Sequence, residues 1–435
     1  MTLRWPVRSK RIVVAGMAVA ATVGAATIVR GALRGHGGPV RALALSKDGQ
    51  IAATGSFDSS AIIWLLENDS AAQVLRFHAG AVNAVALLPD GGVVTAGEDA
   101  KIAVWERGKP DPVRVLEGHR GPVAALAVAA DGRSIASASW DRTVRLWPID
   151  DGAPRLFEGH ADNVNGVAFS PDGKMLVSAS YDATIRLWPL DGGAPVVRAL
   201  QAPVNAIAVA QDGEIVAASA DGRLRILNQV GDVRQDVEIA SAPLIAVAVS
   251  PDGATIAVAG LRGAVALIDR KSAAPRTTLI GPALPVWSLQ FSPDGATLFA
   301  AGSDRVVRRW DAKTGEARDG VLLSETDQLL KASENDAGAE VFKACVACHT
   351  LTGDDGHRAG PSLHRLFGRK IATAPGYRYS DALTRMDIVW TPETVAKLFE
   401  MGPSRYTPGT KMPEQTLSSP QEREALIKFL ARVTQ

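Results

Sequence analysis

The 435-residue sequence predicts two domains of different fold class, an all-β domain of repeated units followed by a small all-α domain. Two observations predict the all-β part: an Asp-Gly pair recurs every 40 to 42 residues, and each pair separates two runs of alternating or apolar residues. The all-α part is predicted by helix-start signals on both sides of a Cys-x-x-Cys-His sequence near the C-terminus. The chain is long enough to bury two separate hydrophobic cores.

Seven repeats fill residues 28–323. Their Asp-Gly turns begin at Asp48, Asp90, Asp131, Asp172, Asp212, Asp252 and Asp294. In the fourth repeat the turn joins Val164–Phe169 to Met175–Ser180, and a third strand ends at Trp188. A short turn between two such runs is a hairpin signal. Because a period of this length with four short strands per unit is typical of a β-propeller blade, we expect a ring of seven blades.

Three residue types recur at fixed places in these repeats: an opening His, a turn Asp, and a Trp six residues after that Asp. The histidines are His36, His78, His119 and His160, and the tryptophans are Trp64, Trp105, Trp147, Trp188 and Trp310. The turn aspartates are Asp58, Asp99, Asp141, Asp182, Asp221 and Asp304. This pattern resembles the WD-repeat family. The resemblance implies that His, Asp and Trp join a strand Ser or Thr in a hydrogen-bonded set that braces each blade, and is not a catalytic triad.

Repeats five to seven depart from this pattern. Repeats five and six lack the His and the Trp, with Leu227 and Ile268 in the Trp position, and Arg262 replaces the turn Asp in repeat six. Repeat seven keeps Asp304 and Trp310 but has no His. The apolar pattern persists in all three, so we expect complete blades with fewer internal hydrogen bonds.

Two segments compete for the outermost strand of the seventh blade. One is residues 28–33, before the first repeat, and the other is residues 317–323, after Trp310. WD-repeat proteins commonly close the ring with the N-terminal strand, so the resemblance favours residues 28–33.

Two sets of repeat positions are candidate contact sites. The residue before the turn Asp is aromatic at Phe57, Trp140 and Tyr181; such an arc either binds a partner or covers neighbouring loops. The residue after the first apolar position of each repeat should ring the channel mouth, where the set would hold a small polar ligand or line a hydrated channel. This second set comprises Arg41, Asn83, Ala124, Asn165, Asn205, Ile245 and Trp287. Phe57, Trp140, Tyr181 and Trp287 are the candidate partner contacts.

Residues 1–27 are predicted to be a signal peptide or a membrane anchor. A basic segment, Arg4–Arg11, precedes an apolar run, Ile12–Val29. Val23–Ala26 offers a cleavage site, and the run is also long enough to cross a bilayer with its basic flank in the cytoplasm. Both alternatives export the rest of the chain, so we expect it in a bacterial periplasm, either released or tethered to the cytoplasmic membrane.

Cys345 and Cys348 are the two cysteines of the chain, and His349 follows them directly. This spacing is the c-type haem attachment pattern, in which both thiols form thioethers with the haem and the histidine binds the iron. A structural zinc site would need two further ligands at similar spacing, and a thioredoxin-like site would need a βαβ context. The sequence offers neither. We therefore predict one covalent haem c with its iron.

Residues 335–435 resemble the short, mitochondrial-like class I cytochromes c. The matching segments are Gly360–Leu363, Phe367–Lys370, Ala374–Ser380, Trp390 and Tyr406–Pro413. In this family the first and last helices pack at a crossing of glycine and aromatic residues, which Gly338 and Phe342 would provide on the first helix. Asp336 or Asn335 is positioned to cap that helix, and Ser419-Pro420 to start the last one.

The resemblance also implies roles for single residues of the haem site. The Pro361 carbonyl would accept the free N–H of His349, and Met412 would be the second iron ligand. The other implied haem contacts are Arg369, Tyr379, Trp390 and Thr410, which would hold the propionates. With His349 and Met412 both on the iron, no open position remains for a substrate, which indicates one-electron transfer.

The charge balance limits the function classes. With 47 basic and 46 acidic residues the net charge is +1, which argues against a nucleic-acid-binding protein, since such a protein needs a basic face. The leading hypothesis is an exported electron carrier, not an enzyme, in which a polar linker at 324–334 joins a partner-docking propeller to the cytochrome at 335–435. Its redox partners would be a dehydrogenase or a terminal oxidase. Two alternatives stay open: a scaffold or assembly factor whose haem senses redox state, and a periplasmic propeller dehydrogenase that reduces its own haem.

Overall fold

The computed structural model describes most of the chain from residue 31 onward. The described residues are 31–279, 284–318, 325–346, 348–353, 358, 360–375, 377, 379–410, 412 and 415–435. The predicted signal or anchor at 1–27 lies outside them. Within this part of the chain, none of the helices has the length and apolar character that crossing a membrane requires.

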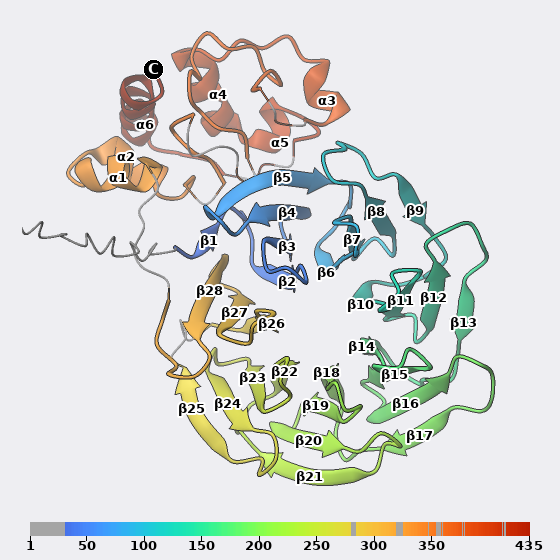
Figure 1. The fold of residues 1–435 in the computed structure, drawn as a ribbon. Helices are drawn as coiled ribbons and strands as arrows, with labels where there is room; N and C mark the ends of the chain where they lie inside the picture. Colours follow the sequence, from blue (N-terminus) through green and yellow to red (C-terminus); the bar gives the residue numbers. More distant parts are fainter. Residues whose placement is uncertain are drawn as a thin grey trace, which may run out of the picture.

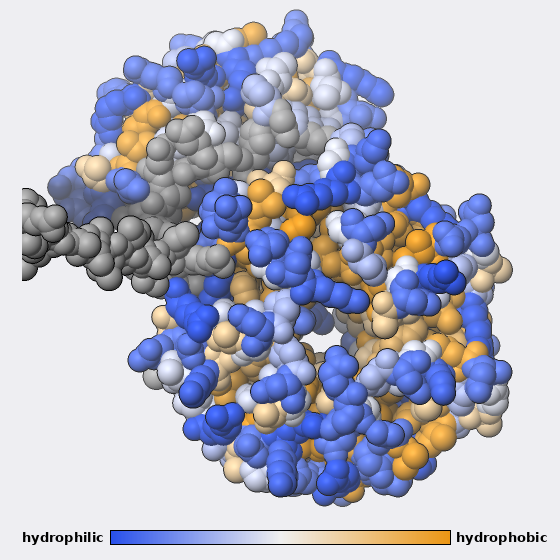
Figure 2. Space-filling model, in the orientation of Figure 1, coloured by the Kyte–Doolittle hydropathy of each residue, from blue (hydrophilic) through white to orange (hydrophobic). Residues whose placement is uncertain are grey.

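Seven four-stranded antiparallel sheets form a closed ring, which confirms the predicted propeller (Figure 1). The first strand of each sheet contacts the first strands of both neighbours and lies at the ring centre. Blades one to three consist of β2 (Val40–Leu45), β3 (Ile51–Ser56), β4 (Ser60–Leu65), β5 (Ser70–Arg76), β6 (Val82–Leu87), β7 (Val93–Gly97), β8 (Ile102–Trp105), β9 (Arg114–Leu116), β10 (Val123–Val128), β11 (Ser134–Ser139), β12 (Val144–Pro148) and β13 (Arg155–Phe157). Figure 2 shows the central channel as an opening through the ring.

The remaining blades repeat this order up to the closure of the ring. Blades four to six consist of β14 (Val164–Phe169), β15 (Met175–Ser180), β16 (Thr184–Pro189), β17 (Val196–Ala199), β18 (Val204–Val209), β19 (Ile215–Ser219), β20 (Arg223–Leu227), β21 (Val233–Glu238), β22 (Leu244–Val249), β23 (Thr255–Gly260), β24 (Val265–Asp269) and β25 (Pro275–Leu279). Blade seven consists of β26 (Val286–Phe291), β27 (Thr297–Gly302), β28 (Val306–Asp311) and β1 (Leu33–Arg34).

The described parts of both candidate segments, residues 31–33 and 317–318, take part in closing the ring, while residues 28–30 and 319–323 lie outside the described residues. Leu33 in β1 pairs with Val307 in β28, and Ala317 forms an isolated bridge with Trp310 further along the same strand. An ion pair between Arg309 of blade seven and Asp69 of blade one adds a side-chain link across the closure. The N-terminal strand therefore closes the sheet, and the segment after Trp310 extends its outer edge.

The first four blades contain the predicted bracing set. In blade three, His119 Nδ1 lies 2.8 Å from Asp141 Oδ2, and its Nε2 lies 2.7 Å from Ser137 Oγ. The same hydroxyl accepts a hydrogen bond from Trp147 Nε1 at 2.8 Å. The corresponding sets are His36–Asp58–Thr54–Trp64, His78–Asp99–Thr95–Trp105 and His160–Asp182–Ser178–Trp188. All four histidines are buried, so these groups hold the blades together and present no reactive centre to solvent.

Blade five replaces the missing histidine with an arginine. Arg225 is 1% exposed, and its guanidinium lies 2.7 Å from the turn carboxylate of Asp221 and 3.1 Å from Asp236 on β21. The turn Asp thus keeps a buried donor, now from β20 of its own blade. The sequence analysis did not predict this substitution.

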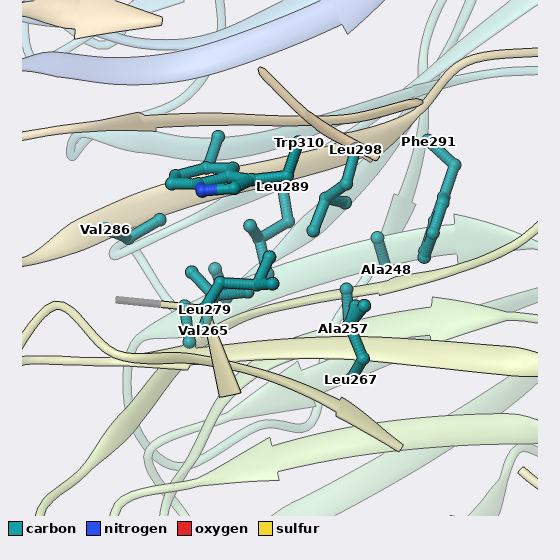
Figure 3. Close-up of a cluster of buried hydrophobic side chains, with 13 residues drawn as sticks. Ala248, Ala257, Val265, Leu267, Leu279, Val286, Leu289, Phe291, Leu298 and Trp310 are labelled. Atoms are coloured by element: carbon teal, nitrogen blue, oxygen red, sulfur yellow. The ribbon is translucent and has the colours of Figure 1, made fainter. Parts of the chain in front are cut away.

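Blades six and seven are held together by apolar packing. Figure 3 shows Val265 and Leu267 of β24 facing Leu289 and Leu298 of blade seven, with Trp310 beside them. This cluster explains why blade six forms without a His, a turn Asp or a Trp: burial of aliphatic side chains supplies the stabilisation that the hydrogen-bonded set gives elsewhere.

The predicted channel-mouth residues occupy a β-bulge in every blade. The register between first and second strands shifts at Arg41, Asn83, Ala124, Asn165, Asn205, Ile245 and Trp287. A bulge redirects the side chain of its extra residue. Asn165 and Asn205 accordingly donate to carbonyls of the next blade, Val204 O at 3.3 Å and Leu244 O at 2.7 Å.

The C-terminal domain is a small helical unit beside the first blade (Figure 1). Its helices are α1 (Glu325–Ala332), α2 (Ala337–Phe342), α3 (Asp381–Thr384), α4 (Pro392–Met401), α5 (Pro403–Tyr406) and α6 (Pro420–Val433). Asp336 caps α2 and Ser419 caps α6, as predicted. Phe342 and Phe429 meet at the α2–α6 crossing with ring centroids 5.8 Å apart.

The stretch 324–334 differs from the predicted polar linker, because most of it forms α1. Leu330 of this helix is buried in the core of the C-terminal domain, and Thr326 Oγ1 accepts a hydrogen bond from the Leu351 amide at 2.8 Å. The polar residues of this stretch lie around one apolar contact that binds the helix to the domain. From Glu325 on, the stretch therefore belongs structurally to the C-terminal domain.

Candidate haem site

The Cys-x-x-Cys-His sequence follows α2 in a continuous series of helical turns. Val346 N donates to Phe342 O at 3.2 Å, and His349 N donates to Cys345 O at 3.0 Å. These bonds keep the two cysteines one turn apart on the same side, with His349 next to them. Burial raises the pKa of the Cys345 thiol to about 12 and that of Cys348 to about 11. Such thiols differ from the acidic thiols of redox-active Cys-x-x-Cys sites.

His349 is held in one tautomer by the predicted contact. Its Nδ1 lies 2.8 Å from the Pro361 carbonyl oxygen, so Nδ1 carries the proton and Nε2 keeps its lone pair. Burial, which outweighs this hydrogen bond, lowers the pKa of His349 to about 4. Positive charge from Arg76, Arg358 and Arg369 acts in the same direction. The imidazole is therefore neutral at pH 7, which is the form that binds a metal.

All nine predicted haem-site residues line one cavity. They are Cys345, Cys348, His349, Pro361, Arg369, Tyr379, Trp390, Thr410 and Met412. Thr410 Oγ1 accepts a hydrogen bond from the Met412 amide at 3.1 Å, a contact within the loop that carries both residues. Cys345 and Met412, which are more than 60 residues apart in sequence, thus meet at one cavity, as the resemblance implies.

Arg369 and Trp390 are held by the backbone around them. Arg369 donates to His364 O at 2.8 Å and to Ser362 O at 2.9 Å, while Trp390 N donates to Arg369 O at 2.9 Å. Burial lowers the pKa of Arg369 and raises that of Tyr379. The two side chains are thus a half-buried cation and a half-buried neutral donor, a combination suited to a carboxylate ligand.

The cavity fits a haem in chemistry and in shape. Most of its wall is apolar, from Phe342, Leu363, Leu366, Ile371, Val395, Leu398, Phe399, Leu426 and Leu430. Gly360 lies flat against the imidazole, since a Cβ there would stand 2.4 Å from His349 Cε1. An apolar slot with two thiols, a neutral imidazole and a thioether matches the donors of a c-type haem.

Three residues of this cavity come from the propeller and were not predicted from the sequence. Gly37, Asp58 and Arg76 of blade one line the same space as the cytochrome residues. Asp58 had been assigned only to the blade brace, and Arg76 carried no motif. The sequence carries only a weak signal: the residue two positions before the repeat histidine is arginine at Arg34 and Arg76 but glutamate at Glu117 and Glu158.

The candidate partner contacts are not among the residues that line this cavity. Phe57, Trp140 and Tyr181 are 47%, 43% and 42% exposed. Trp140 Nε1 donates to Asn165 at 3.1 Å. Trp287 is half-buried, with Phe57 6.3 Å away and the Arg41 guanidinium 5.2 Å from its ring centroid. An exposed aromatic arc therefore exists at the predicted positions.

Comparison with protein families agrees with both domains. The family model "WD domain, G-beta repeat" matches residues 28–64, 70–106, 110–148, 154–189, 195–228 and 273–311. These matches leave out residues 229–272, which contain three of the four strands of the blade without His, turn Asp or Trp. The family model "Cytochrome c" matches residues 336–434.

Curated relatives match the cytochrome part at nearly their full length. Cytochrome c of Cochliobolus lunatus is 44% identical over 98 residues, which is 22% of this chain and 90% of that protein. Cytochrome c of Arabidopsis thaliana is 44% identical over 98 residues, 22% of this chain and 87% of that protein. That of Sesamum indicum is 42% identical over 99 residues, 22% of this chain and 88% of that protein. Such a domain implies covalently bound haem c with its iron, and the chain belongs to both the WD-repeat and the cytochrome c families, joined as a seven-bladed propeller followed by a cytochrome c domain.

Proposed function

We propose that this protein is an exported electron carrier whose haem is attached through Cys345 and Cys348 and ligated by His349 and Met412. One observation carries the proposal: Met412 lines the same cavity as the neutral, Pro361-bonded imidazole of His349. His349 and Met412 would hold the haem iron, and a histidine with a thioether would favour the ferrous state, which suits a carrier of single electrons. The N-terminal basic and apolar segments support export to the periplasm, with the protein either free or anchored.

Replacing Met412 with alanine tests this ligation. The ferric wild-type protein is expected to show the weak far-red band of a methionine–iron bond, and Met412→Ala is expected to abolish it. The reduction potential should fall by on the order of 0.1 V, a part of the roughly 0.8 V over which axial ligands set haem potentials. Visible spectroscopy and a redox titration of the purified chain measure both effects.

Met401→Ala is the matched control. Met401 is 46% exposed on α4, so its removal should leave the band and the potential unchanged. If the band survives in Met412→Ala and disappears in Met401→Ala, the assignment of the second ligand is wrong.

We also propose that the aromatic arc of the propeller docks the redox partner. Exposed Trp and Tyr contribute large contact areas at little entropic cost and are enriched among interface hot spots. Phe57, Trp140 and Tyr181 occur in three of the first four blades, so they form a one-sided surface. Trp287 packs near Phe57 and supports that end of the arc.

The double variant Trp140→Ala/Tyr181→Ala is expected to slow haem reduction or oxidation by respiratory membranes of the source organism at least tenfold, from the roughly 2 kcal/mol that a hot-spot residue contributes. Oxidation by ferricyanide should not change, because this small reagent needs no docking surface. Leu261, 38% exposed at the same repeat position of blade six, provides the control Leu261→Ala. Equal rates with membranes for all three proteins would rule out the arc as the docking site.

A further inference from the structure

The propeller contributes directly to the haem cavity. Gly37, Asp58 and Arg76, which we call the blade-one wall, share the cavity with Cys348 and His349. Gly37 lies so near the attachment sulfur that a Cβ on it would be 2.3 Å from Cys348 Sγ. Propeller backbone thus packs on one of the two sulfur atoms that the haem requires. Figure 1 shows the same proximity at the level of elements, with β1 and β5 facing the cytochrome domain.

Arg76 bridges the two domains at this wall. It is the last residue of β5, and its guanidinium carbon lies 5.4 Å from the ring centroid of Tyr377 in the cytochrome domain. This is the distance of a cation–π contact. Arg76 Nε is buried and has no hydrogen-bond partner among the described residues. A buried cationic donor is therefore left at the edge of the haem cavity.

The charge at the position of Arg76 differs between blades. Two positions before the repeat histidine, blades one and seven carry Arg76 and Arg34, while blades two and three carry Glu117 and Glu158. Glu117 pairs with Lys101 on the blade surface at 2.6 Å. The two blades that face the cytochrome domain therefore carry the basic residue. Fold stability does not require this arginine, because the neighbouring blades form the same strand with an acidic residue.

Asp58 adds a fixed negative charge to the same wall. Its carboxylate accepts hydrogen bonds from Gly37 N at 2.8 Å and Ser60 Oγ at 2.6 Å, and lies 3.1 Å from His36 Nδ1. These contacts outweigh burial and hold the pKa of Asp58 far below its ordinary value, so it is ionised at pH 7. The wall thus presents a cation and an anion to one cavity.

We propose that the propeller completes the haem site, with Arg76 and Asp58 acting on the haem iron as opposing charges that tune its reduction potential. The inference rests on the proposed attachment of haem at Cys348. Ferric haem carries one more positive charge than ferrous haem. A nearby cation therefore disfavours the ferric state and raises the potential, while a nearby anion lowers it. Two domains, and not the cytochrome alone, would set the driving force for electron transfer.

Redox titration of the full-length holoprotein tests the inference through shifts of opposite sign. Arg76→Gln is expected to move the redox equilibrium against a mediator roughly tenfold toward the ferric state, which is about 59 mV for one electron. Asp58→Asn is expected to move it in the ferrous direction. Asp141→Asn breaks the same bracing set in blade three, and Arg142→Gln removes an exposed arginine beside it. Both controls should keep the wild-type potential.

If Arg76→Gln and Arg142→Gln, both with intact haem, have the same reduction potential, the inference is wrong. This result decides the question even if Asp58→Asn fails to fold. Shifts of the same sign in both wall variants would overturn it too, since charge effects must oppose each other. The haemochrome spectrum separates this result from failure of the proposed function: a wild-type chain without covalent haem would contradict that function itself.

Discussion

Replacing Gly338 with alanine is expected to destabilise the cytochrome domain by about 3 kcal/mol, at the upper end of the usual cost of overpacking. A Cβ at Gly338 would stand 2.1 Å from Ala425 O and 2.6 Å from Phe429 Cβ, so α2 and α6 could not remain as close together as they are. Ala425 O belongs to the backbone of α6, so it cannot shift without the rest of the helix. Separation of the helices would also weaken the Phe342–Phe429 contact at the same crossing.

The direction of the stability change in Gly338→Ala identifies its cause. In an exposed helix, glycine to alanine stabilises by about 1 kcal/mol, so a loss of stability must come from the crossing. Denaturation followed by haem absorbance reports on this domain. Glu340→Ala, exposed on the same helix, is expected to stay within about 0.5 kcal/mol of wild type. A Gly338→Ala protein as stable as wild type would mean that the helices do not pack this closely in solution.

The haem site was predictable because each of its parts is recorded in a short segment. Cys345 to His349 is a contiguous pattern, and the Pro361, Arg369 and Met412 segments each match the cytochrome c family over several residues. The propeller was predictable for a related reason. Each Asp-Gly turn, at its constant period, predicts one hairpin independently of the others. In the first four blades, the recurring His, Asp and Trp predict which side chains form hydrogen bonds with one another.

Features that depend on contacts between distant segments could not be predicted from the sequence. Arg225 substitutes for a blade histidine only because Asp236, on the neighbouring strand, completes its ion pairs. Helix α1 is short and mostly polar, and its attachment through Leu330 becomes visible only against the folded domain. The role of Arg76 depends on which blade the cytochrome packs against, and periodicity treats all blades alike. Local patterns therefore identified both domains, but not the way one contributes to the site of the other.

Replacing Gly360 with alanine is expected to lower the amount of low-spin haem protein at least tenfold, in line with the roughly 10- to 100-fold effects of losing a group that orients a metal ligand. The new Cβ would stand 2.4 Å from Cε1 and 2.7 Å from Nδ1 of His349. Gly360 N also donates to Cys348 O at 2.7 Å, so the loop is held against the attachment segment. The imidazole would then have to turn away from the Pro361 carbonyl, losing the hydrogen bond that keeps Nε2 unprotonated and directed into the cavity.

Gly353→Ala is the matched control for this change, because it adds the same methyl group beside a different histidine. There the Cβ would approach His364 Cδ2 at 3.3 Å, and a half-buried ring can give way by a few tenths of an ångström. Visible spectra and haem content of the two variants, purified alongside the wild type, measure the difference. Because the two substitutions are alike in size and in loss of backbone freedom, only the distance to the ring separates them. If Gly360→Ala keeps the wild-type spectrum and haem content, close contact between this loop and His349 cannot be what holds the ligand in place.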